Sequence, residues 1–252
     1  MKASTERIIN LIFILTPIAC VLLIWQVGAI AVGSEYILPD IKSTLVALIS
    51  LLKGKAFYRS LLGTLYRTAV AFAISFSIAT VLAFLTRIQK RAETVISPLI
   101  SILRALPTIA VIVLLQYWTN SKIASIVVTT LVVLPTSYSS MREAFFSVDN
   151  DLIKALKLFN VSEGELIKKV YFPAILPATL LAVGNGLTLN LKLMVAAEVL
   201  SATANSLGYL LNTSKVNYEV ASTIAIVVIT VAIGLTVEGV FRLISKKVGK
   251  WQ

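Results

Sequence analysis

The chain has 252 residues, of which 58% are hydrophobic and only 14% charged, and its mean hydropathy is +0.90. This composition is too apolar for a soluble domain, so the sequence predicts an integral membrane protein. The absence of histidine and the single cysteine exclude a histidine-dependent triad, a cysteine-rich metal site and a disulfide within the chain, and the scattered basic residues behind the net charge of +11 do not indicate nucleic-acid binding.

The apolar runs predict membrane-spanning helices. The hydrocarbon core of a bilayer is about 30 Å thick, which needs about 20 helical residues. The amino-terminal run resembles a signal peptide, but its apolar body exceeds the usual length of about 7–15 residues, so we expect a retained helix. We predict an all-α protein with six transmembrane helices, at Ile8–Val32, Ser60–Thr86, Val95–Trp118, Lys122–Met141, Ala174–Leu200 and Ala221–Ile244.

The segment between the first two runs, residues 34–59, is predicted to be an external loop. Its apolar residues recur at helical spacing, from Ile41 through Leu45 and Leu48 to Leu52. This spacing predicts a short helix that lies at the membrane interface.

The distribution of basic residues predicts the orientation of the chain. With the amino terminus inside, 14 Lys and Arg residues lie in the cytoplasm and six lie outside. Short cytoplasmic loops carry an excess of such residues, so we expect both termini to be cytoplasmic. The charged stretch at residues 143–173 then becomes a cytoplasmic loop.

The sequence contains no phosphate-binding loop for ATP. The pairs Gly54–Lys55 and Gly249–Lys250 lack both the upstream glycine and the following hydroxyl residue of that motif. No predicted loop combines a nucleophile with a base. We therefore predict that this chain is not an enzyme and has no catalytic residues.

The cytoplasmic loop is predicted to contain two short helices. Asp149 or Asn150 is placed to cap the first, whose apolar stripe comprises Leu152, Ile153, Leu156 and Phe159. Asn160 is expected to end that helix in a left-handed conformation.

The second short helix is predicted to start at Ser162, with Glu165 at the spacing of a capping box, and to close on Pro173. By itself such a segment is equally compatible with a plain surface connector.

Residue order in this loop resembles the EAA loop of ATP-binding-cassette (ABC) importer permeases. The matching positions are Lys154, Ala155, Leu156, Asn160, Ile175, Leu176 and Pro177, with Pro173 also in place. Lysine replaces the family's acidic residue, leucine its second alanine and asparagine its glycine. Of these, asparagine is the mildest change because it tolerates left-handed backbone.

The resemblance extends from about Leu38 to Trp251. It is strongest to the permeases for nitrate, sulfonates, taurine and thiamine-precursor pyrimidines. The elements that carry it are Ser60–Arg67, Ser97–Leu99, Leu103–Pro107, Ala196–Glu198 and Leu207–Leu210.

This resemblance implies one transmembrane permease domain, residues 1–252, with the six-helix bundle of type I importers in the cytoplasmic (inner) membrane. It also implies a homodimer, two copies of a separate ATPase and an extracytoplasmic substrate-binding protein. No cofactor is expected in this chain, because ATP and Mg would be bound by the ATPase. The residues expected to couple to the ATPase are Leu152, Lys154, Ala155, Leu156, Phe159, Asn160, Pro173 and Pro177.

Polar residues inside the apolar runs are candidates for the substrate path, because ionisable groups in spans are costly and mark functional sites. The predicted path residues are Arg104, Asn185, Asn190, Lys192 and Glu198. Basic groups on the path favour a small solute that is anionic, such as an oxyanion, or an acceptor-rich heterocycle. For Arg67 and Arg104 a role in helix packing or at an interface is the alternative reading, and for Lys192 it is a structural pairing or a side chain that reaches the membrane surface. The alternative function is a self-contained secondary carrier or channel with Lys192 and Glu198 as a charge relay.

Overall fold

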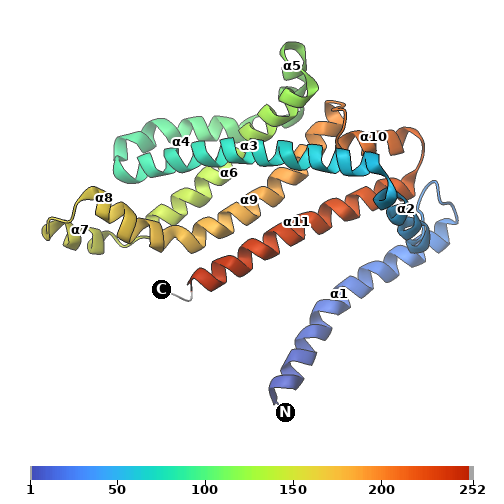
Figure 1. Cartoon of the computed structure of the whole chain (residues 1–252), viewed down its shortest axis with the longest axis horizontal. Helices are drawn as coiled ribbons and strands as arrows, with labels where there is room; N and C mark the ends of the chain where they lie inside the picture. Colours follow the sequence, from blue (N-terminus) through green and yellow to red (C-terminus); the bar gives the residue numbers. More distant parts are fainter. Residues whose placement is uncertain (1, 250–252) are drawn as a thin grey trace. The chain divides into compact units, whose positions relative to one another are not determined.

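The computed structural model describes residues 2–249, with side chains for Phe13 and from Thr16 onward except at positions 90, 150, 152, 157 and 163. Every regular element in this range is a helix (Figure 1). The elements are α1 (Lys2–Val32), α2 (Ile41–Lys53), α3 (Lys55–Ile88), α4 (Lys90–Ala105), α5 (Thr108–Trp118), α6 (Ser121–Phe146), α7 (Asn150–Leu158), α8 (Glu163–Leu166), the π-helix η1 (Ile167–Tyr171), α9 (Phe172–Leu200), α10 (Leu207–Val216) and α11 (Val220–Gly249).

The chain divides into two compact units, which are described separately below. The first unit comprises Met1–Tyr58 and Leu210–Ile229, and the second comprises Arg59–Tyr209 and Thr230–Gln252.

In the first unit, α1 and α2 are joined by a short turn. Gly33, with a φ of 62°, ends α1 in a left-handed conformation that glycine adopts without strain. The indole N–H of Trp25 donates to the carbonyl of Pro39 at 3.0 Å, and Gln26 Oε1 accepts from the backbone N–H of Ile41 at 3.2 Å. The helical spacing in residues 41–52 therefore correctly predicts a helix, α2. Its position at a membrane interface stays a prediction.

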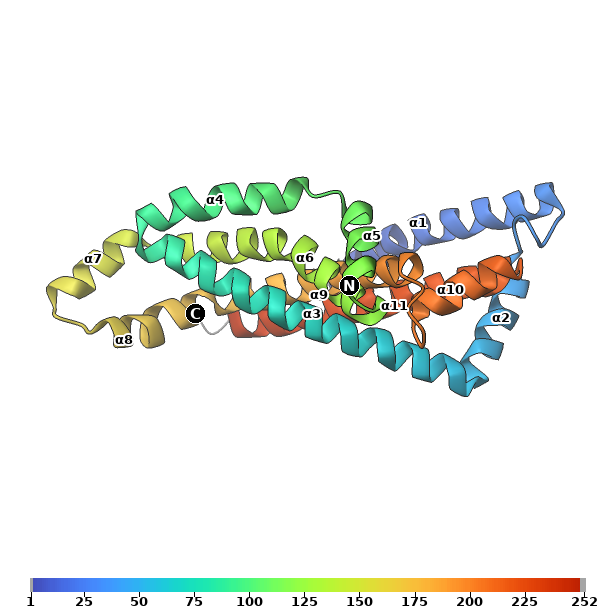
Figure 2. The same ribbon diagram turned by 90° about the horizontal axis from the view of Figure 1, so that it is seen from above.

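In the second unit, α6 and α9 pack against each other extensively, and α3 and α4 lie beside them (Figures 1 and 2). Small residues allow close approach: a Cβ added at Gly184 on α9 would lie 2.7 Å from Phe241 Cβ on α11. The core of this unit is a cluster that includes Ala83, Met141, Phe145 and Ile175, all buried. This core fixes the helices that carry the candidate functional residues.

The predicted third span is wrong as one continuous helix. Two helices, α4 and α5, take its place and are bent by 90° relative to each other. Pro107 has no N–H to donate, and it forces the preceding Leu106 into extended backbone, with φ −64° and ψ 124°. The chain therefore turns sharply where the sequence places the middle of a span.

The predicted end of the second loop helix at Pro173 is also wrong. The helix that begins at α8 continues through η1 into α9, and the stretch Gly164–Leu200 is continuous. In η1 the backbone N–H of Phe172 donates to the carbonyl of Ile167, five residues earlier. This wider turn precedes Pro173 at the start of α9, so the chain passes the proline without breaking the helix.

Four helical stretches in the described part of the chain are long and apolar enough to cross a membrane: Lys55–Ile88, Ser121–Phe146, Gly164–Leu200 and Val220–Gly249. The bent α4–α5 pair would make a fifth, and the apolar helix Thr16–Val32 is shorter. Many large apolar side chains are exposed on these helices, such as Leu62, Val95 and Leu235, as expected for surfaces that face lipid. Six spans and two cytoplasmic termini remain predictions.

Candidate functional site

The loop at residues 149–173 lies at one end of the second unit, with α7 and α8 beyond the ends of α4 and α6 (Figures 1 and 2). The predicted cap is present, because Asp149 Oδ1 accepts from the backbone N–H of Asp151 at 2.8 Å. Asn160 has a φ of 56°, which confirms the predicted left-handed end of the first helix. Ser162 Oγ accepts from the backbone N–H of Glu165 at 3.3 Å, which confirms the predicted start of the second.

The side chains of α7 divide between the core and the surface. Ile153 is buried and Leu156 is half-buried, and both pack against the core of the second unit. Lys154 and Ala155 are exposed, and Lys154 Nζ lies 2.8 Å from Asp151 Oδ1. The side chain of Leu152 lies outside the described residues. Pro173 and Pro177, also predicted to couple, lie half-buried in α9.

Phe159 is 81% exposed and its neighbour Leu158 is 84% exposed. Together these two residues form what we call the apolar tip of the loop. Phe159 is among the predicted coupling residues, whereas Leu158, which falls outside the helical stripe, is not. A local signal for Leu158 is the turn expected at Asn160, because side chains in the last turn of a helix need not follow its apolar stripe.

The predicted path residues on α9 lie on two different faces. Asn185 and Lys192 are exposed and seven residues apart, which places them on the same side of the helix. Asn190 and Glu198 are buried on the opposite side, and the amide of Asn190 donates to the carbonyl of Thr68 at 2.8 Å. Lys192 and Glu198 therefore do not meet as the pair that a charge relay would need.

Arg104, the remaining predicted path residue, is exposed in the last turn of α4 and donates to Ser139 Oγ of α6. At the other end of α4, Glu93 pairs with Arg142 of α6. An acid in the first turn and a base in the last turn both complement the helix dipole. These two contacts hold α4 against α6 and keep the Arg104 guanidinium beside Ser139.

Glu198 forms a buried ion pair with Arg67 of α3, and the two residues are 0% and 6% exposed. Arg67 Nη2 lies 2.7 Å from Glu198 Oε1, and Arg67 Nε donates to the same oxygen at 2.8 Å. The hydroxyl of Thr64 donates to Glu198 Oε2 at 2.8 Å. Both charges are therefore compensated, as buried charges must be. This pairing was not predicted, although an acid and a base in separate apolar runs are a signal for it.

The same carboxylate caps the start of α10. Glu198 Oε2 accepts from the backbone N–H of Gly208 at 3.3 Å, and Thr64 Oγ1 accepts from that of Leu207 at 2.9 Å. A Cβ at Gly208 would lie 2.4 Å from Glu198 Cβ, and one at Gly63 would lie 2.4 Å from the carbonyl of Asn205. Only glycine allows these close approaches. The cluster joins α3, α9 and α10 within the second unit.

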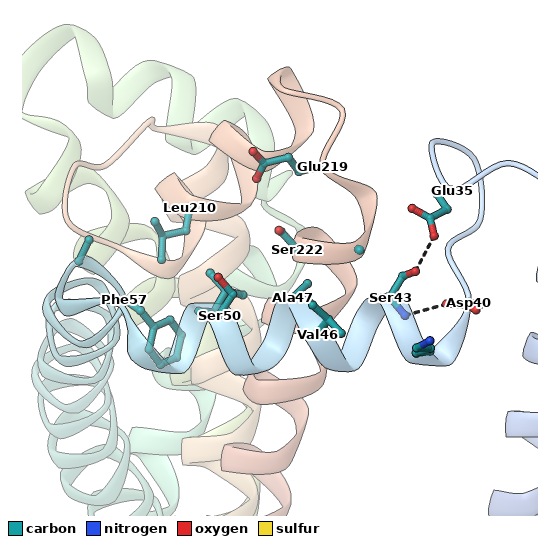
Figure 3. Close-up of a pocket in the computed structure, with 15 residues that line it drawn as sticks. Glu35, Asp40, Ser43, Val46, Ala47, Ser50, Phe57, Leu210, Glu219 and Ser222 are labelled. Carbon is teal, nitrogen blue, oxygen red and sulfur yellow. Dashed lines mark hydrogen bonds between the residues drawn. The ribbon is translucent and has the colours of Figure 1, made fainter.

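One cavity belongs to the first unit and has a volume of about 810 Å³. It lies along α2, with Glu219 and Ser222 on its other side (Figure 3). Ser43 Oγ donates to Glu35 at 2.6 Å, and the backbone N–H of Ser43 donates to Asp40 at 2.7 Å. This backbone hydrogen bond is the main cause that lowers the pKa of Asp40. These carboxylates thus serve the turn and the cap of α2.

The described side chains contain no group of three or more His, Cys, Asp or Glu residues that could hold a metal ion. The candidate functional features are therefore the helix-packing clusters, the exposed basic groups and the apolar tip.

A family model described as a binding-protein-dependent transport system inner membrane component matches residues 75–250. The chain belongs to this family. It is a multi-pass permease component of the inner membrane, as the resemblance predicts.

Curated relatives of this permease are similar over most of its length. An aliphatic sulfonates transport permease, SsuC of Bacillus subtilis, is 24% identical over 236 residues, covering 93% of this chain and 85% of its own. A formylaminopyrimidine transport permease, ThiX of Halalkalibacterium halodurans, is 24% identical over 202 residues, covering 77% and 75%.

Solved structures support the fold of the permease. An inward-facing MetNI methionine ABC transporter has a TM-score of 0.67 at 20% identity and covers 76% of this chain and 95% of its own. An amino acid ABC transporter has a TM-score of 0.66 at 20% identity and covers 79% and 98%. The all-α, type I importer-like fold is therefore confirmed.

Proposed function

We propose that this permease forms the substrate path of an ATP-driven importer and that α7 docks onto a separate ATPase subunit. The observation that carries the proposal is the apolar tip. Leu158 and Phe159 are more than 80% exposed. They lie next to charged groups such as the pairs Lys154–Asp151 and Lys169–Glu165, which are typical of an aqueous surface. Large apolar groups on such a surface mark a protein contact.

The continuity of the helix behind the loop supports a coupling role. Ile153 anchors α7 in the core of the second unit, and the helix from Gly164 runs unbroken to Leu200. A rigid helix transmits a displacement of one end to its other end. Closure of the ATPase subunits around ATP would thereby move α9 and the residues it carries.

The partners in this proposal are those that the resemblance to the family implies. The ATPase would bind ATP and Mg, and this chain would need no cofactor of its own. A binding protein would deliver the substrate at the external face, and two copies of the permease would form the path. This assembly is what the resemblance to ABC importer permeases implies, and it is carried over to this chain as part of the proposal.

Replacing Phe159 with Asp tests the docking site. The change would place a charge in a contact that excludes water, so ATPase association should weaken at least about 30-fold, the effect of losing a contact worth about 2 kcal/mol. Copurification of the cognate ATPase with the tagged permease measures the loss, and transport should fall with it.

Two variants control this experiment. Phe159→Leu keeps an apolar group at the tip and should retain the ATPase. Gly164→Asp adds the same charge five residues away, at an exposed position where a Cβ meets nothing within 4 Å, and should also retain it. Normal copurification with Phe159→Asp would refute docking through the tip.

We further propose that the substrate is a small anionic or acceptor-rich organic solute, or an oxyanion. Support comes from the exposed basic groups of Arg104 and Lys192 and from the named substrates of relatives, which include aliphatic sulfonates. Guanidinium and ammonium groups donate charge-assisted hydrogen bonds to such solutes. Asn185, on the same face of α9 as Lys192, would add a neutral donor and acceptor. The buried Asn190 and Glu198 would support this face from behind.

Uptake assays with an alkyl sulfonate test the basic groups. Arg104→Gln and Lys192→Gln should each raise the KM for uptake about tenfold, because a hydrogen bond to a charged group contributes about 1.5–3 kcal/mol. Arg91→Gln and Lys122→Gln remove matched charges at exposed positions elsewhere and should leave the KM unchanged. An unchanged KM in both test variants would remove these residues from the path.

A further inference from the structure

A second cavity, in the second unit, is lined almost entirely by apolar side chains. It lies between α3, α6, η1 and α9 and has a volume of about 390 Å³. This volume falls in the range of small-molecule sites, which is roughly 300–1,000 Å³. Its floor includes Met141, Phe145 and Ile175, which are buried in the core. None of the residues assigned to the loop tip or to the substrate path lines this groove.

The groove is open along one side. Its rim includes Val81 of α3, which is 58% exposed, and Phe172 of α9, which is 60% exposed. Both helices belong to stretches apolar enough to cross a membrane. An acyl chain of the surrounding lipid can therefore enter sideways, whereas a polar solute would find no hydrogen-bond partner on most of the wall.

A positive charge with unused hydrogen-bonding capacity lies next to the groove. The guanidinium of Arg87 lies 5.3 Å from the ring centroid of Phe146 and 5.7 Å from that of Tyr171, a residue that lines the groove. One of its terminal nitrogens donates to the carbonyl of Val148 at 3.2 Å. Its Nε is buried and has no hydrogen-bond partner among the described atoms. Arg87 as a whole is only half-buried, so its terminal N–H groups, unlike Nε, stay within reach of an outside acceptor.

We propose that this groove binds an anionic phospholipid, with an acyl chain along the apolar wall and the phosphate at Arg87. Basic pockets between membrane helices recognise anionic headgroups in this way. The exposed Lys168 of η1 adds a second positive charge, directly after Ile167, which lines the groove. The proposal is independent of the coupling role and of the transported substrate.

Native mass spectrometry of the delipidated full chain in detergent tests the site. Phosphatidylglycerol should bind about fivefold more tightly than phosphatidylcholine with the same acyl chains, which corresponds to about 1 kcal/mol for one basic residue. Arg87→Gln should abolish this preference and Arg87→Lys should keep most of it. Arg91→Gln, the matched loss of an exposed charge, should leave the preference intact.

A second pair of variants tests the groove without touching the arginine. Val81→Trp fills the groove and should remove the bound phosphatidylglycerol. Ile78→Trp adds the same bulk at an exposed position on α3 outside the groove and should not. Equal binding of the two lipids by the wild type, or retention of phosphatidylglycerol by Val81→Trp, would overturn the proposal. The proposal would also be overturned if the wild-type permease formed a dimer without bound lipid and only Val81→Trp dissociated it. The groove would then be occupied by a second copy of the chain.

Discussion

Glu198 shows how one buried side chain can join three helices. Its carboxylate neutralises Arg67 of α3, accepts from Thr64 of the same helix and caps α10 through the N–H of Gly208. A negative charge at a helix amino terminus is favourable, and burial in the low-dielectric interior strengthens each of these contacts. The residue first assigned to the substrate path therefore has a structural environment that leaves neither of its oxygens free.

Breaking this pair should destabilise the protein strongly. Glu198→Gln leaves the Arg67 charge buried without its partner, so the free energy of unfolding should fall by about 3–5 kcal/mol. Thermal unfolding of the detergent-purified chain, followed by tryptophan fluorescence, measures the change. The double variant Arg67→Met/Glu198→Met should lose less than the sum of its single variants, because it leaves no unpaired charge.

A surface pair on α11 provides the control. Glu238 and Arg242 lie four residues apart, and Arg242 is largely exposed. Glu238→Gln should cost less than about 1 kcal/mol, as exposed pairs generally do. Equal losses for Glu198→Gln and Glu238→Gln would contradict the structural role of the buried cluster.

At the scale of elements, the end of α7 is set by local backbone chemistry. Asn160 adopts a φ of 56°, and the N–H of Val161 donates back to the carbonyl of Leu156 at 3.3 Å. This is the arrangement of a helix that ends through a left-handed residue. It turns the chain directly after the apolar tip and so determines how Leu158 and Phe159 are presented.

Substitution of Asn160 should show whether its left-handed backbone or its side chain holds the turn. Asn160→Gly should preserve the turn, whereas Asn160→Ala should weaken it by about 1–2 kcal/mol because alanine disfavours left-handed backbone. Hydrogen exchange at the amide of Val161 reports the difference, and exchange should be faster in the alanine variant only. Equal exchange in the two variants would show that the asparagine side chain, rather than its backbone, holds the turn.

At the scale of the whole molecule, the orientation in the membrane decides which surface could meet the proposed ATPase. The predicted topology places Lys154 and Lys246 in the cytoplasm and Lys42 outside. Labelling of single cysteines at these positions tests it, in a Cys20→Ala background that removes the chain's one thiol.

An impermeant maleimide should label Lys42→Cys in intact cells, because this position is exposed and lies in the segment predicted to be external. It should label Lys154→Cys and Lys246→Cys only in inverted membrane vesicles. Labelling of Lys42→Cys and Lys154→Cys from the same side would contradict the topology and with it the proposed ATPase face.

The sequence by itself determined the features that depend on neighbouring residues or on composition. Apolar content made the chain a membrane protein, helical spacing indicated α2, and Asn160 and Ser162 marked the turn in the loop. Ordered motifs identified the permease family. Each of these signals is local, so no knowledge of distant contacts was needed.

Only the tertiary structure decided the rest. The backbone hydrogen bonds around each proline decide how the chain bends at Pro107 and why the helix continues through Pro173. The pairing of Glu198 with Arg67 joins residues 131 positions apart. Sequence spacing does not show which polar residues meet, because desolvated charges take whichever partner the packing of the helices brings within reach.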